Sequence, residues 1–166
     1  MSKTKPFDMD AYVETISSGP CFICEMLARN QEYAHHIIYQ DEQAVVFLNK
    51  FPILYGYVLV APVEHREQVT GDFTVPEYLE LQKLIFRASE AVRQVVPAER
   101  VYLLSLGSQQ GNSHVHWHVA PLPPGVPFHE QQLEALLVTD RVLDLSGEEM
   151  SGLASQIRLA MDRVKS

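Results

Sequence analysis

Three histidines alternate with apolar residues in one short segment, which reads His114-Val115-His116-Trp117-His118-Val119. Successive side chains of a β-strand point to opposite faces, so this pattern predicts a strand with its three imidazoles on one face. A neutral imidazole can attack phosphorus, donate a hydrogen bond to an anion or bind a metal ion. The segment therefore predicts a reactive face, and its histidines need not share one role.

Two chemistries suit this face, besides the plainer alternative of half-buried histidines without a role. Histidines at alternate strand positions can bind one metal ion, as in zinc sites with three histidine ligands. An iron site with two histidines and a carboxylate is disfavoured, because the next acidic residue is Glu130. The other chemistry is nucleophilic attack on a phosphate. The preceding loop, residues 107–113, favours it, because its glycines and polar residues could present N–H groups and hydroxyls to phosphate oxygens.

A second group of possible ligands lies near the start of the chain, where Cys21 and Cys24 form a Cys-x-x-Cys pair. This spacing allows metal binding, thiol redox chemistry or two small buried apolar side chains. Two cysteines do not make the disulfide framework of a secreted domain. His35, His36 and His129 match no motif and are expected to be surface or packing residues.

The elements that must position these residues are strands and helices in irregular order. Apolar runs between turn residues predict strands, and a Thr-x-x-Glu capping box at Thr74 predicts the longest helix, which ends before Pro97. The lack of regular strand–helix–strand alternation predicts an α+β fold. The expected strands are 37–39, 44–48 and 57–61, which form an antiparallel meander, and 101–106 and 114–120; further helices are expected at 9–16, near 130–138 and from a cap at 146–149.

The 166 residues are 46% hydrophobic and 20% charged, as in an ordinary globular protein, and contain no repeat or Gly/Ser linker. We therefore expect a single domain over 1–166. The net charge of −8 repels polyanions, so we expect no binding to nucleic acid or membranes. No apolar run reaches the roughly 18 residues of a membrane span, and the first ten residues lack the apolar run of a signal peptide. These features predict a cytoplasmic protein.

The histidine segment resembles the signature of the histidine triad (HIT) superfamily of nucleotide hydrolases and transferases, which is His-x-His-x-His followed by apolar residues. The resemblance covers about residues 20–125 and leaves 126–166 as a C-terminal helical extension. It implies a HIT-like α+β fold with a five-stranded antiparallel meander sheet, one long helix and peripheral N- and C-terminal helices. It also implies a homodimer. Other segments that match in the family's order are 21–24, 45–52, 56–65 and 105–113.

The resemblance implies roles for individual residues. His116 corresponds to the nucleophile that takes up the nucleotidyl group, and His118 to the neighbour that hydrogen-bonds the α-phosphate. Ser113 corresponds to a loop residue that helps to protonate the leaving group, so these three are the predicted catalytic residues. The predicted nucleotide-binding residues are Asn49 at the ribose, Asn112 and Gly111 in the phosphate loop, and Ser105 near the leaving group.

The chain departs from the family pattern at three positions. Tyr57 stands where family members have histidine, and Ser105 stands where they have Asn or Gln. Ser113 directly precedes His114, without the usual two residues between them. The loop is therefore shorter than in the family.

Zinc-containing members of the superfamily take two ligands from positions that correspond to His65 and His114. Together with Cys21 and Cys24, these residues complete the four ligands of a tetrahedral site. The resemblance therefore implies a structural zinc ion.

The resulting hypothesis is a nucleotide-binding hydrolase. It would cleave a purine nucleoside phosphate or a dinucleoside polyphosphate at the α-phosphate, through a covalent nucleotidyl-histidine. One alternative is a nucleotidyl transferase resembling galactose-1-phosphate uridylyltransferase, although those enzymes carry Gln where this chain has His118 and contain two such halves. The other alternative is a regulatory nucleotide-binding protein whose turnover is incidental.

Overall fold

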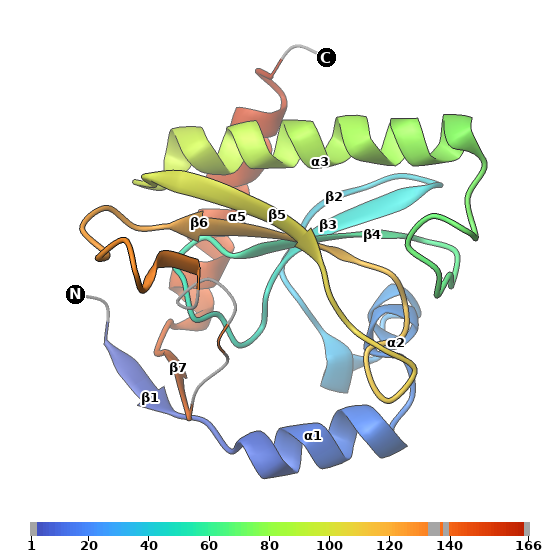
Figure 1. Ribbon diagram of the computed structural model, residues 1–166, viewed down its shortest axis with the longest axis horizontal. Coiled ribbons are helices and arrows are strands. Elements are labelled where there is room, and N and C mark those ends of the chain that lie inside the picture. The colour runs from blue at the N-terminus through green and yellow to red at the C-terminus, as the bar shows by residue number, and fades with distance from the viewer. Residues whose placement is uncertain (1–2, 133–136, 138–139, 165–166) are drawn as a thin grey trace.

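A five-stranded antiparallel sheet lies at the centre of the computed structural model, which describes residues 3–132, 137 and 140–164 (Figure 1). A second, two-stranded sheet joins the N-terminal segment to a segment near the C-terminus. The strands are β1 Thr4–Pro6, β2 Ile37–Gln40, β3 Ala44–Leu48, β4 Val58–Pro62, β5 Arg100–Ser105, β6 Trp117–Leu122 and β7 Arg141–Leu143. The helices are α1 Met9–Ser18, α2 Phe22–Leu27, the 3-10 turn η1 Gln31–Tyr33, α3 Val75–Val95 and α5 Gly147–Met161.

Helix α3 begins at the predicted capping box. Thr74 Oγ1 accepts a hydrogen bond from Glu77 N, and Glu77 Oε2 accepts one from Thr74 N. Figure 1 shows α3 lying along one face of the large sheet, and its apolar side packs there together with α5. This core includes every second residue of the histidine segment and of the central strands: Val46, Leu48, Val58, Val60, Val115, Trp117 and Val119.

The opposite face of the sheet carries a second, smaller core and the histidines. Ile23 and Met26 of α2 pack there against Phe47, Leu59 and other strand residues. The alternation within β3 explains this division, since Phe47 points to the α2 side while Val46 and Leu48 point to α3. The sheet therefore separates the larger apolar core from a layer that contains the polar site.

The predicted fold class is confirmed, with one difference in the strand order. The large sheet runs β2-β3-β4-β6-β5, so β6 rather than β5 pairs with β4. In this sheet β2, β3 and β4 are antiparallel neighbours in sequence order, and β5 and β6 also pair with each other. After the connection through α3, however, β6 lies next to β4 and β5 lies at the edge. The meander is therefore not continuous.

Helices are described at both expected termini, and α5 begins at a capping box of Ser146 and Glu149. The regular strand predicted from 114 begins only at Trp117, although the alternation of the side chains extends back to His114. The helix expected near 130–138 falls mostly outside the described residues. The small sheet of β1 and β7 was not predicted. Among the described residues, no helix combines the length and apolarity needed to cross a membrane.

Candidate functional site

The histidine segment is held in place by its neighbours on both sides before the regular strand begins. Val115 N donates a hydrogen bond to Arg66 O at 2.7 Å, and Ser105 Oγ donates one to His116 O at 2.7 Å. The first two histidines are almost fully buried, with exposed fractions of 1% for His114 and 3% for His116. Buried imidazoles need hydrogen-bond partners, and these partners decide which ring nitrogen carries the proton.

His116 has one ring nitrogen bound to the backbone. Its Nδ1 lies 2.7 Å from His114 O, and since a carbonyl oxygen only accepts, Nδ1 carries the proton and donates it. Nε2 of the neutral ring therefore carries a lone pair. Burial lowers the pKa of His116, which favours this neutral form. The geometry makes His116 a candidate nucleophile.

His118 lies beside His116, with the two ring centroids 4.8 Å apart. Its Nδ1 is 3.0 Å from the hydroxyl of Tyr57, while its buried Nε2 has no hydrogen-bond partner among the described residues. Burial lowers the pKa of His118 to about 3 and raises the pKa of Tyr57 to about 12. Both groups are therefore neutral at physiological pH.

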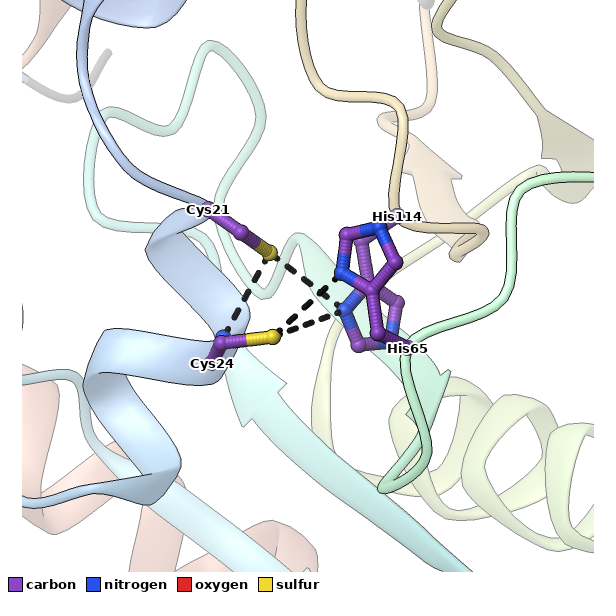
Figure 2. A group of neighbouring side chains, drawn as sticks. All are labelled: Cys21, Cys24, His65 and His114. Atoms are coloured by element: carbon purple, nitrogen blue, oxygen red, sulfur yellow. Dashed lines mark hydrogen bonds between the residues drawn. The ribbon is translucent and has the colours of Figure 1, made fainter.

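The four predicted ligands lie together on one side of this segment. Cys21 caps the N-terminus of α2 and Cys24 lies in its first turn, while His65 follows β4 and His114 precedes β6. Figure 2 shows both imidazoles turned toward the two sulfur atoms. The Sγ–Nδ1 distances are 3.4 Å for Cys21–His114, 3.4 Å for Cys24–His65 and 3.6 Å for Cys24–His114, and all four donor atoms lie within 4.8 Å of one another.

These distances fit a tetrahedral metal site. With zinc–sulfur bonds of about 2.3 Å and zinc–nitrogen bonds of about 2.0 Å, the edge between S and N of a tetrahedron is about 3.5 Å. The other nitrogen of each imidazole has a partner outside the cluster: His114 Nε2 lies 2.9 Å from Pro62 O, and His65 Nε2 lies 3.1 Å from Glu67 Oε1. Such outer partners fix the lone pair on Nδ1, which faces the sulfurs. The four residues could therefore bind a metal ion.

A cleft of about 800 Å³ opens over the histidine face. Its wall includes His116 and His118 together with α1, residues 49–51 after β3 and residues 109–113 of the loop before His114. This loop closes tightly on itself, because Gly107 has a φ of 112° and a Cβ there would lie 2.5 Å from Asn112 O. The cleft also contains Asn49, Gly111, Asn112 and Ser113. Ser105 does not line it and instead binds the backbone of His116 from behind.

Residues 30–124 match the family model of the HIT domain, and this match spans more than half of the chain. The chain belongs to the HIT family. An uncharacterized HIT-like protein of Saccharolobus solfataricus is 31% identical over 108 residues, which are 61% of this chain and 73% of that protein. An uncharacterized HIT-like protein of Borreliella burgdorferi is 28% identical over 105 residues, 61% of this chain and 74% of its own.

Solved structures of other HIT proteins have the same fold. A hypothetical histidine triad nucleotide-binding protein of Sulfolobus tokodaii aligns with a TM-score of 0.68 at 25% identity, over 86% of this chain and 92% of its own. A zinc-bound histidine triad family protein of Mycobacterium smegmatis aligns with a TM-score of 0.62 at 20% identity, over 84% and 94%. At 20% identity, the similarity to the Mycobacterium smegmatis protein shows only that the two chains share a fold.

Part of the cleft in this HIT protein comes from outside the matched region. Phe7 and Tyr12 of the N-terminal segment form an aromatic cluster with Phe51, with ring centroids 5.0 to 5.9 Å apart. Tyr12 also accepts a hydrogen bond of 3.4 Å from Asn112 Nδ2. The spacing of residues within α1 does not predict that this helix lines the cleft, because the cleft wall forms only when α1 folds over the HIT domain.

His35 is a cleft residue that sequence reasoning assigned to the surface or the packing. Its Nδ1 donates to Tyr33 O at 2.7 Å, and its ring packs against Phe22 and Phe47, with centroids 5.7 and 5.2 Å away. Burial lowers the pKa of His35, so the ring is neutral. It belongs to no motif, and only the tertiary structure places it in the same cleft as His116.

Proposed function

We propose that this HIT protein is a nucleotide-binding hydrolase. It cleaves a phosphoramidate, phosphoester or phosphoanhydride bond at the α-phosphate of a purine nucleoside phosphate or a dinucleoside polyphosphate. The observation that carries the proposal is the hydrogen bond from His116 Nδ1 to His114 O, which leaves a lone pair on Nε2 in a buried ring at the cleft. The name of the Sulfolobus relative, a nucleotide-binding protein, agrees with it.

The reaction has two displacements at phosphorus. In the first, His116 Nε2 forms a bond to the α-phosphorus, the bond to the leaving group breaks, and the leaving group takes up a proton, with Ser113 as the expected donor. In the second, water attacks the phosphorus and passes a proton back to Ser113, the P–N bond breaks, and a nucleoside monophosphate leaves with His116 regenerated. The fixed proton on Nδ1 stays hydrogen-bonded to His114 O, which stabilises the positive charge on the substituted ring.

We further infer that the Cys21, Cys24, His65 and His114 cluster holds a structural zinc ion. Two sulfur and two nitrogen donors in tetrahedral arrangement are the ligand set that zinc prefers. All four ligand positions are filled by protein, so the ion would cross-link α2, the segment after β4 and the histidine segment. The zinc-bound relative from Mycobacterium smegmatis agrees with this choice of metal.

The decisive experiment removes the nucleophile. His116→Ala is expected to lower turnover of an adenylated substrate by several orders of magnitude, because a missing nucleophile abolishes the covalent route. Its affinity for AMP should remain measurable by calorimetry. Rapid quenching of the wild type with radiolabelled substrate should place the label on the peptide that contains His116.

His36→Ala is a matched control, because His36 does not line the cleft and its replacement is expected to leave turnover unchanged. Near wild-type turnover in His116→Ala would contradict the proposed mechanism. AMP binding without turnover of any adenylated compound by the wild type would instead favour the regulatory nucleotide-binding protein.

A further inference from the structure

Tyr57 occupies a buried position in contact with the last histidine of the triad. It precedes β4 by one residue, and β4 pairs Leu59 with His118 of β6. Only 5% of Tyr57 is exposed, and its ring meets that of His118 edge-on, with centroids 5.7 Å apart. The backbone that delivers it is constrained, because Gly56 has a φ of 82° and a Cβ there would lie 2.5 Å from a methyl of Val96.

The hydroxyl of Tyr57 has a single hydrogen-bond partner in the part of the chain that the structure describes, namely His118 Nδ1 at 3.0 Å. His118 Nε2 is buried and has none. A phenol has one proton to donate, and burial keeps it protonated, because the pKa of Tyr57 rises to about 12. The number of unsatisfied groups therefore depends on which nitrogen of His118 carries the proton.

If the proton is on Nε2, Tyr57 donates to Nδ1, and one group, the Nε2–H donor, remains without a partner. If the proton is on Nδ1, it can point to the tyrosine oxygen, but the phenol hydrogen then has no acceptor and the Nε2 lone pair has no donor. Burying polar groups without partners is unfavourable, so the arrangement with one such group prevails over the arrangement with two.

We propose that Tyr57 is a positioning residue that holds His118 as the neutral Nε2–H tautomer, so that His118 presents a hydrogen-bond donor to the α-phosphate of the substrate. The proposal deepens the proposed hydrolase function and, for its effect on turnover, rests on it. A phosphate oxygen would supply the partner that the Nε2–H group lacks in the free protein. The resemblance to the family places histidine at this position, and a phenol differs from an imidazole because it has no second tautomer.

The first test needs no substrate. Ring ¹⁵N chemical shifts of His118 in the free wild-type protein at neutral pH should show a protonated Nε2 and an unprotonated Nδ1. In Tyr57→Phe, which keeps the ring and removes the hydroxyl, the same nuclei should shift toward values that average the two tautomers. A protonated Nδ1 in the wild type, or unchanged shifts in Tyr57→Phe, would overturn the proposal.

The second test measures turnover. Tyr57→Phe should lower kcat by about 10-fold with little change in KM, which is less than the about 100- to 1000-fold loss expected when a transition-state donor is removed outright. Tyr55→Phe is the matched control, because Tyr55 is 39% exposed in the same loop and lies outside the cleft; its kcat should be that of the wild type.

A double substitution separates positioning from a general structural role. In a His118→Ala background, Tyr57→Phe should cause no further loss of kcat, because the residue through which the hydroxyl acts is gone. An equal loss in both backgrounds would show that Tyr57 acts on the fold instead. If the wild type turns over no nucleotide, the proposed function fails while the ¹⁵N shifts still decide the tautomer.

Discussion

Each histidine of the triad has one ring nitrogen engaged by a different part of the fold. His114 Nε2 meets the carbonyl of Pro62, His116 Nδ1 meets the carbonyl of His114, and His118 Nδ1 meets the hydroxyl of Tyr57. The remaining nitrogen is what each ring can offer to a ligand. For His114 it faces two sulfurs, for His116 it is a lone pair at the cleft, and for His118 it is a donor that has no partner among the described residues. Three identical side chains thus differ in their chemistry because the hydrogen-bond partner of one ring nitrogen decides what the other nitrogen can do.

Asn49 shows the same division within one amide group. Its Oδ1 accepts a hydrogen bond of 2.9 Å from Phe51 N and shapes the turn after β3, which leaves Nδ2 to donate into the cleft. We predict that Asn49→Ala lowers the affinity for AMP by about 10-fold, the equivalent of one hydrogen bond. Calorimetry should also show that the variant no longer prefers AMP over 2′,3′-dideoxy-AMP, because the ribose hydroxyls have lost their donor.

Asn49→Asp is the control for the turn, since its carboxylate can still accept from Phe51 N. If Asn49→Ala lowers stability but keeps the preference for the ribose hydroxyls, Asn49 is a turn residue only.

At the scale of elements, the Cys21, Cys24, His65 and His114 cluster joins segments that are far apart in the sequence. It links the first turn of α2 to the segment after β4 and to the residues before β6. The adjacent Arg66 extends this link, because its guanidinium binds Glu77 at the start of α3 at 2.7 Å. One short segment therefore connects the possible metal site to the longest helix.

We predict that the purified protein contains about one zinc ion per chain and that Cys24→Ser does not retain it. The melting temperature of this variant should fall by roughly 10 °C or more, since 1 kcal/mol corresponds to about 2 to 4 °C in a chain of this size. A chelator should lower the melting temperature of the wild type and have no further effect on Cys24→Ser. Well-folded protein with no bound metal would contradict the zinc proposal.

The contact between Glu77 and Arg66 predicts a pH-dependent contribution to stability. The hydrogen bond from Arg66, together with those from Thr74, lowers the pKa of Glu77 from 4.5 to about 2. The unfolded chain therefore takes up this proton before the folded one does, so the contribution is complete above pH 4.5 and is lost as the pH falls toward 2. Glu77→Gln should be less stable than the wild type at pH 7, and the difference should shrink over that range.

Urea unfolding at several pH values measures this difference, and taking the difference cancels the titration of all other groups. Glu80→Gln removes an exposed carboxylate from the same helix without touching Arg66, so it controls for the lost charge. A stability difference that stays constant from pH 7 to pH 3 would refute the explanation.

At the scale of the whole molecule, β5 is an edge strand of the large sheet, and apolar side chains lie exposed on it and on α3. Leu103 of β5 is 51% exposed and Phe86 of α3 is 54% exposed. Unpaired edges and apolar surface are commonly covered by a second subunit. We predict a homodimer, which light scattering at micromolar concentration would report as twice the 18.8 kDa of one chain.

Leu103→Glu should shift this equilibrium toward the monomer, because it places a charge at the edge, whereas Leu159→Glu on the exposed side of α5 should not. A single 18.8 kDa particle in the wild type would refute the dimer.

The sequence predicts local features of this molecule well and relations between segments poorly. Thr74 and Glu77 identify the start of α3 because a capping box involves four consecutive residues. The alternation of the triad likewise reveals the two faces of its segment. The sequence holds no comparable signal for the place of β6 beside β4, and the contact of Tyr57 with His118 depends on that pairing. The Cys-x-x-Cys spacing alone indicates Cys21 and Cys24 as possible ligands, but His65 and His114 are added only through resemblance to a family, since they lie 41 and 90 residues from Cys24.

Helix α1 forms one wall of the cleft although none of its ten residues is buried. Its N-terminal end follows β1, which is fastened to β7, and its C-terminal end runs through Gly19 and Pro20 into Cys21 of the possible metal site (Figure 1). The helix is supported mainly at its two ends, while Tyr12 contacts Phe51 and Asn112 partway along it. The width of the cleft then depends on those supports. Deleting residues 3–6 or replacing Cys21 would loosen one of these supports and thereby change the width of the cleft at a distance from the substituted position.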